Sequence, residues 1–230
     1  MVDRPNAARP TARPLTLAVD VVLFTPRGNE LAALLAPAGP AARPRERLLL
    51  PSDALRADET LDTAALRIAR DASGAVPSLL EQAGAIGGAK RQQDLASVAV
   101  TYFGLIPDAS ASRRVGEWIP LSDIAGLVGR PREQLDLALS AMRARVDQQP
   151  IAFRLLPPAF TLSELQGVYE LLLGRRLHKA SFRRALHASA LVEPTDEWRS
   201  EGRGRPAQLF RYAPPRRRRQ RRGIRFDLIG

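Results

Sequence analysis

The last third of the chain carries an order of sequence patterns that few folds can accommodate. Thr161-Leu162-Ser163-Glu164 is a capping box, in which the Thr hydroxyl accepts from the third amide of a helix and the Glu carboxylate reaches back to the cap amide. It predicts a helix over 162–173, and a second helix is predicted over 179–189. Two strand-like segments, 191–193 and 207–212, follow on either side of a Gly/Arg/Pro-rich turn. This order of elements predicts a winged helix-turn-helix.

The second predicted helix has one apolar and one basic face. Phe182 and Leu186 lie one turn apart, which leaves Arg183, Arg184 and His187 on the opposite face, placed to meet a major groove or its phosphates. A basic face that is merely solvated is the alternative. The residues predicted to bind DNA lie on this face, at the helix start and in the following turn: Lys179, Ser181, Arg183, Arg184, His187, Arg203 and Arg205.

The positive charge of the chain is concentrated in the same region. Residues 1–150 carry 18 Lys and Arg against 17 Asp and Glu, whereas residues 151–230 carry 17 basic and 7 acidic side chains, so the second part holds +10 of the net +11. This asymmetry indicates a polyanionic partner. The arginine-rich segment 214–230 is predicted to add sequence-independent attraction to DNA, although contact with RNA or a membrane surface stays open. An Ala/Arg/Pro-rich composition without such a partner is the bland alternative.

Composition also excludes several kinds of site. The chain has no cysteine, which excludes disulfides, zinc ribbons and cysteine nucleophiles. Its two histidines, His178 and His187, have no further candidate metal ligands nearby, so we expect no metal and no cofactor. No apolar run approaches the roughly 20 residues that span a bilayer, and we expect a cytoplasmic protein without a membrane partner.

The first 150 residues alternate strand and helix patterns. Strands are predicted over 15–25, 31–35, 96–106 and 117–121. Helices are predicted over 59–72, capped by Asp58 and ended by Gly74, and over 132–146. The mixture predicts an α+β or α/β sandwich with a boundary near Pro150.

Both parts of the chain resemble the Nudix-related transcriptional regulators. The C-terminal resemblance is carried by FTLSELQGVYELLLG, the SFRRAL helix and GRPAQLFRY. The N-terminal resemblance is carried by LAVDVVLFT, by LLLPSDALRADETLDTAALRIARDASGA at the Nudix box and by LEQAGAIGG after it. In that family the Nudix domain binds a nucleotide such as ADP-ribose, and the winged helices of a homodimer bind operators that control NAD or sugar metabolism.

The resemblance implies an α+β fold, a Nudix-like α/β/α sandwich followed by a winged helix-turn-helix domain. The expected segments are a disordered N-terminus over 1–14, a ligand-sensing domain over 15–130, a connecting helix over 131–150, a DNA-binding domain over 151–213 and an arginine-rich tail over 214–230.

The Nudix box decides between enzyme and sensor. Its pattern is G-x5-E-x7-R-E-U-x-E-E-x-G-U, where U is aliphatic, and Glu59, Arg67, Gly74 and Ala75 match it here. The first glycine is replaced by Asp53, the Glu after the Arg by Ile68, and the paired Glu residues by Asp71 and Ala72. Carboxylates on successive helical turns would hold Mg²⁺ against a diphosphate, so their loss predicts a protein that is not an enzyme and has no catalytic residues.

The resemblance therefore implies a DNA-binding regulator, in the first place a repressor, with a double-stranded operator as partner and a nucleotide-type effector. Arg67, Lys90 and Arg91 are its predicted ligand-binding residues. Two alternatives stay open, a Nudix pyrophosphohydrolase acting on a nucleoside diphosphate derivative and an RNA-binding or adaptor protein.

Overall fold

The N-terminal domain is built on one mixed β-sheet. The computed structural model describes residues 16–37, 48–87, 98–108, 116–200 and 206–213. The sheet has the order β3-β2-β1-β6-β5, with β4 paired to β1 and β7 to β2, and only the β1–β6 pair is parallel. The strands are β1 Leu17–Arg27, β2 Glu30–Pro37, β3 Leu48–Leu49, β4 Ser52–Ala54, β5 Leu79–Gly87, β6 Val98–Leu105 and β7 Glu117–Pro120.

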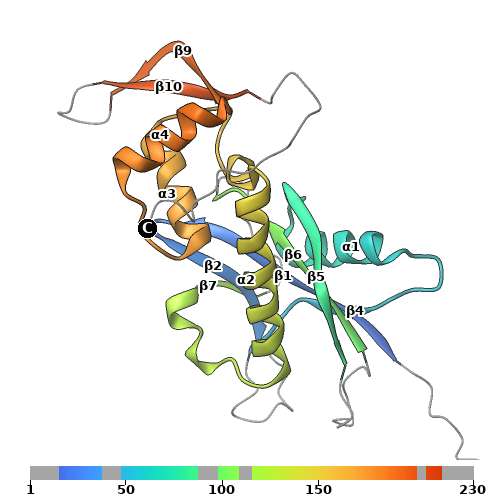
Figure 1. Ribbon diagram of the computed structural model, residues 1–230. Coiled ribbons are helices and arrows are strands. Elements are labelled where there is room, and N and C mark those ends of the chain that lie inside the picture. Colours follow the sequence, from blue (N-terminus) through green and yellow to red (C-terminus); the bar gives the residue numbers. More distant parts are fainter. Residues whose placement is uncertain (1–15, 38–47, 88–97, 109–115, 201–205, 214–230) are drawn as a thin grey trace, which may run out of the picture.

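Two helices cover opposite faces of this sheet (Figure 1). Along β1, Val21 and Leu23 belong to the core under α1, Leu61–Ser73, whereas Val22 and Phe24 belong to the core under α2, Arg130–Gln148. A strand buried on both faces needs apolar side chains at successive positions, which is why this run reads as continuously hydrophobic. The result is the predicted α/β/α sandwich.

The start of α1 differs from the prediction. The cap is Thr60 and not Asp58: its hydroxyl accepts from the amide of Thr63 at 3.2 Å, and the Thr63 hydroxyl accepts from the amide of Thr60 at 2.8 Å. Asp58 lies too early to reach these amides once Thr60 and Thr63 satisfy each other. Gly74 ends the helix in the left-handed conformation, with φ of 74° and its amide bonded to the Arg70 carbonyl, as predicted.

The sequence patterns missed two features of the sheets. β5 is a nine-residue edge strand paired with β6, although its alanines and glycines give it little β propensity. β9, Val192–Arg199, extends well beyond the predicted 191–193, because cross-strand pairing with β10 continues through Pro194, which an edge strand tolerates.

The C-terminal domain has the predicted helix, helix, strand, strand order. Its elements are η3 Ile151–Leu155, β8 Ala159–Phe160, α3 Leu162–Leu173, α4 Lys179–Ser189, β9 and β10 Ala207–Tyr212, with β10 between β8 and β9. The Thr161 and Glu164 capping box is present, with bonds of 3.1 and 2.6 Å. Phe160 packs edge-on against Phe153, and Tyr169 packs edge-on against Phe182. These aromatic contacts link β8 to η3 and α3 to α4.

Helix α2 joins the domains. Its predicted range was 132–146, and in the structure it is a 19-residue helix that contacts β1, β5 and β6 as well as α3 and η3. Met142 and Val146 are fully buried in a core that continues from Phe24 to Leu186. The two domains therefore share apolar packing. None of the described helices is long and apolar enough to cross a membrane.

Candidate nucleic-acid interface and sensor domain

The exposed face of α4 carries the basic side chains that the sequence predicted. Phe182 and Leu186 are fully buried, whereas Arg183, Arg184 and His187 are exposed. Packing of the apolar pair against α3 thus leaves the other side of the helix free to meet a ligand. Among the described residues, no carboxylate forms an ion pair with Arg183 or Arg184. Two guanidinium groups without internal partners are suited to guanine edges or phosphates.

The start of α4 is also open. Lys179 is exposed, and the Ser181 hydroxyl lies 3.3 Å from Nδ1 of His178, the N-cap residue. Within the described chain, no side chain bonds to the first amides of the helix from the cap position. Amides at a helix start attract anions, and the phosphate contacts predicted for this end stay a prediction. Arg203 and Arg205, predicted for the wing, lie outside the described residues.

The wing strands are tied to the start of α3 by an ion pair. Arg199 of β9 donates to Glu164 Oε1 at 2.6 Å and to the Ala159 carbonyl at 3.3 Å. Glu164 uses its other oxygen in the capping box, so one carboxylate serves both the helix start and the wing. The wing is thereby held against the helical part of the domain.

In the N-terminal domain, Arg67 braces the loop before α1. Its Nε and Nη2 donate to the two oxygens of Glu59 at 2.6 and 2.9 Å, and its Nη1 donates to Asp53 at 2.6 Å. These bonds hold the pKa of both carboxyls below their usual values, and the carboxylates raise the pKa of Arg67. Arg67 thus has a structural role in the loop, and its predicted contact with a ligand stays a prediction. Lys90 and Arg91 lie outside the described residues.

Two of the three box positions that lost glutamate are apolar and buried. Ile68 and Ala72 are 5% and 8% exposed and pack in the core between α1 and the sheet. Asp71, between them in sequence, is exposed. No group of three or more acidic or histidine side chains that could hold a metal is found among the described residues.

A buried carboxylate that the sequence patterns did not single out lies under α2. Asp20, in the middle of β1, is 6% exposed and accepts a hydrogen bond from the Gln134 side chain of α2. Burial raises the pKa of Asp20 against the opposing effects of Ser52, Arg130 and Gln134. The Arg130 guanidinium also donates to the Ile86 carbonyl of β5 at 3.2 Å. These contacts hold the first turns of α2 against the sheet. The sequence feature that could have indicated this site is the single acid within the apolar segment LAVDVVLFT.

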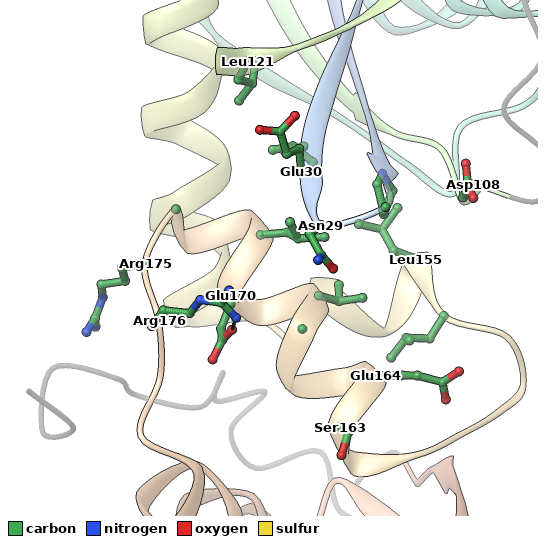
Figure 2. A pocket seen from close by; sticks show the side chains of 18 of the residues that line it. Asn29, Glu30, Asp108, Leu121, Leu155, Ser163, Glu164, Glu170, Arg175 and Arg176 are labelled. Carbon is green, nitrogen blue, oxygen red and sulfur yellow. Dashed lines mark hydrogen bonds and ion pairs between the residues drawn. The ribbon is translucent and has the colours of Figure 1, made fainter. Parts of the chain in front are cut away.

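A cleft of about 880 Å³ separates the two domains on one side (Figure 2). The β1–β2 turn contributes Asn29 and Glu30, and α3 contributes Glu164 and Glu170. Arg176, which follows α3, lies beside Glu170 in this view. The cleft brings the hairpin of the sensor domain opposite the first helix of the C-terminal domain.

Comparison with known proteins agrees with this architecture. The model of the NrtR DNA-binding winged helix domain family matches residues 152–212. The ADPR responsive transcriptional repressor NtrR of Acinetobacter baylyi is 35% identical over 166 residues, which make up 69% of this chain and 66% of that protein, slightly under two thirds of its length.

Solved structures match over both domains. Shewanella oneidensis NrtR, in a crystal structure with a 27mer DNA, superposes with a TM-score of 0.72 at 29% identity and covers 86% of this chain and 93% of that one. A MutT/nudix family protein from Enterococcus faecalis has a TM-score of 0.67 at 17% identity over 88% of this chain and 90% of that one, which shows the fold alone. Taken together, these similarities show a Nudix-like domain followed by an NrtR-type winged helix, the arrangement of the Nudix-related transcriptional regulators.

Proposed function

We propose that this protein is a DNA-binding transcriptional regulator, acting as a repressor, whose Nudix-like domain senses a nucleotide-type effector such as ADP-ribose. The observation that carries the proposal is the exposed face of α4, where Arg183, Arg184 and His187 project from a helix anchored by Phe182 and Leu186. A second helix of this kind, in a winged helix, is the element that enters a major groove. We expect the protein to act in the cytoplasm.

The relatives support the choice of partners. The Acinetobacter baylyi relative is an ADPR responsive transcriptional repressor, and the Shewanella oneidensis relative was crystallised with a 27mer DNA. We infer by similarity that the present chain binds an operator and releases it when a nucleotide of this class binds. Because winged helices usually read two half-sites about one DNA turn apart, we also propose a homodimer.

We further propose that the Nudix-like domain does not hydrolyse its ligand. Ile68 and Ala72 fill the core between α1 and the sheet, and Glu59 and Asp53 are occupied by Arg67. Catalysis of this type needs carboxylates free to hold Mg²⁺ and to activate water. Asp71 alone, on the solvent side of α1, is a poor substitute.

The experiment that tests the proposal measures binding by fluorescence anisotropy to a duplex from the protein's own upstream region, to a scrambled duplex and to RNA of the same length. We expect preference for the first duplex, a steep salt dependence and loss of binding on addition of ADP-ribose. Equal binding to RNA would favour an RNA-binding or adaptor role. Mg²⁺-dependent turnover of ADP-ribose that disappears in Glu59→Gln would favour a pyrophosphohydrolase.

A further inference from the structure

The turn between α3 and α4 is clamped by two side chains of α3. The amide of Leu177 donates to Glu170 Oε1 at 2.9 Å, and the carbonyl of Leu177 accepts from Gln166 Nε2 at 3.0 Å. The Gln166 amide also donates to Glu170 Oε1 at 2.9 Å, which locks the two side chains together. Both backbone groups of one turn residue are therefore bound by the same face of α3. The apolar side chain of Leu177 is buried as well, with 5% of its surface exposed.

Glu170 is the centre of this clamp. Its side chain is 13% exposed, and its second oxygen accepts from Arg176 at 3.0 Å. Burial alone would raise the pKa of Glu170, but the bonds from the Leu177 amide, Gln166 and Arg176 together hold the pKa below its usual value. The clamp therefore contains a carboxylate that is ionised at neutral pH. Hydrogen bonds to an ionised acceptor are roughly twice as strong as neutral ones.

The clamp lies immediately before α4. His178, the next residue after Leu177, is the N-cap, and it provides no side-chain bond to the first amides of the helix. Only Phe182 and Leu186 of α4 are buried. The direction of the helix axis thus depends on these two side chains and on how the preceding turn is held. If a guanidinium group on α4 moved by about 0.5–1 Å, a hydrogen bond of about 2.9 Å to a base would be stretched beyond the usual range of such bonds.

We propose that Glu170, together with Gln166, is the positioning residue that sets how well α4 discriminates its operator from other DNA. Neither side chain needs to touch DNA for this role. The inference rests on the proposed function, since it concerns the accuracy of the same DNA-binding helix. Glu170 also lines the interdomain cleft opposite Asn29 and Glu30, so the clamp lies where the sensor domain meets the DNA-binding domain (Figure 2).

The test compares Glu170→Ala, Glu170→Gln and Glu197→Ala in the full-length protein. Glu197 is an exposed residue of β9 in the same domain, so its replacement removes the same charge without touching the clamp. The probes are the tightest-binding duplex from the protein's own upstream region and its scrambled version. The measured quantity is the dissociation constant for the scrambled duplex divided by that for the upstream duplex, so a lower ratio means poorer discrimination. Thermal melting is the control for folding.

Glu170→Ala should lower this ratio about tenfold relative to Glu197→Ala, since a displaced α4 loses part of a base contact. Affinity for the scrambled duplex should be alike in these two variants, because the charge change is the same. Glu170→Gln should keep most of the discrimination, since its amide oxygen can still accept from Leu177. A ratio in Glu170→Ala equal to that in Glu197→Ala would overturn the inference.

If Glu170→Ala shows no cooperative melting transition, Gln166→Ala decides, because it removes only the bond to the Leu177 carbonyl and the support of Glu170. Its ratio should fall about threefold relative to wild type, a fraction of one base contact. An unchanged ratio there would also overturn the inference. Failure of the proposed function looks different, since the wild-type protein would then bind neither duplex in preference to RNA.

Discussion

Arg67 Nη1 lies 2.6 Å from Asp53 Oδ2, and Asp53 stands where the Nudix pattern has glycine. Asp53, which departs from the pattern, thus gives Arg67, which matches it, a second carboxylate partner. Glu59 binds the other edge of the same guanidinium. The loop before α1 is held by ion pairs between its carboxylates and Arg67 of α1.

The first prediction concerns the acid stability of this loop. The pKa values of Asp53 and Glu59 lie below their usual 3.8 and 4.5 in the folded chain. Such groups contribute stability above the unfolded pKa that is lost as the pH falls through the folded pKa. Arg67→Gln should therefore lower the melting temperature at pH 7 and make it less sensitive to pH below about 4.5. Melting followed from pH 7 to pH 3 checks this, and an unchanged acid limb would contradict it.

The second prediction concerns the buried acid under α2. The pKa of Asp20 is raised in the folded chain, so the folded state binds this proton more tightly than the unfolded state, and stability falls as the pH rises above about 4. Asp20→Asn removes that cost and can still accept from Gln134. It should be more stable than wild type to urea at pH 7, with the difference shrinking towards pH 4. Asp71→Asn, at an exposed position of α1, is the control and should not differ from wild type in this way.

The third prediction separates the reading helix from the tail. Arg184→Ala should weaken operator binding about 10- to 100-fold and scrambled-DNA binding far less, since a guanine contact is worth about 1–3 kcal/mol. Deleting residues 214–230 should lower both affinities together and reduce the log–log salt slope by about 0.9 for each lost phosphate contact. Titrations of both duplexes at several salt concentrations distinguish them. Loss of operator preference on tail deletion, with preference intact in Arg184→Ala, would show that α4 is not the reader.

The fourth prediction compares two glycines of the C-terminal domain. Gly174, which ends α3, has φ of +69°, and a Cβ there would lie 2.7 Å from Arg143 Nη2. Gly174→Ala should cost about 1–2 kcal/mol of unfolding free energy, mostly from the left-handed backbone. Gly167 lies inside α3 with nothing within 4 Å of a built Cβ, so Gly167→Ala should add about 0.5–1 kcal/mol. Urea unfolding measures both, and a loss of stability in Gly167→Ala would show that the cleft beside it is tighter than described.

Local chemistry explains which elements the sequence could predict. The capping box at Thr161 and the glycine at 174 are complete within a few residues, so α3 was predicted to its ends. The basic face of α4 follows from helical periodicity and the burial of Phe182 and Leu186. The lost glutamates at 68 and 72 follow from pattern alignment, because this part of the box lies within the single helix α1.

The remaining features depend on contacts between distant residues. β5 forms a strand because it pairs with β6, whereas its own alanines and glycines do not predict a strand. Asp20 and Gln134 are 114 residues apart, and only the folded sheet brings them together. The residues of the Glu170 clamp are close in sequence. Their contacts nevertheless depend on the path of the turn after Gly174, which a periodic pattern of apolar residues does not predict.

Helix α2 is fastened to the sensor sheet near both ends, by Gln134 with Asp20 of β1 and by Arg145 with Glu81 of β5, and it also contacts α3 and η3 of the DNA-binding domain. The helix runs about 21 Å from Gln134 to its last residue, Gln148, so a tilt of about 5° about Gln134 that strained the Arg145–Glu81 pair would carry the far end by about 1.8 Å. That travel exceeds the roughly 1 Å over which a hydrogen bond to a base is lost. Such a displacement would let a small adjustment in the sheet weaken the proposed contact between α4 and DNA without any change within α4 itself.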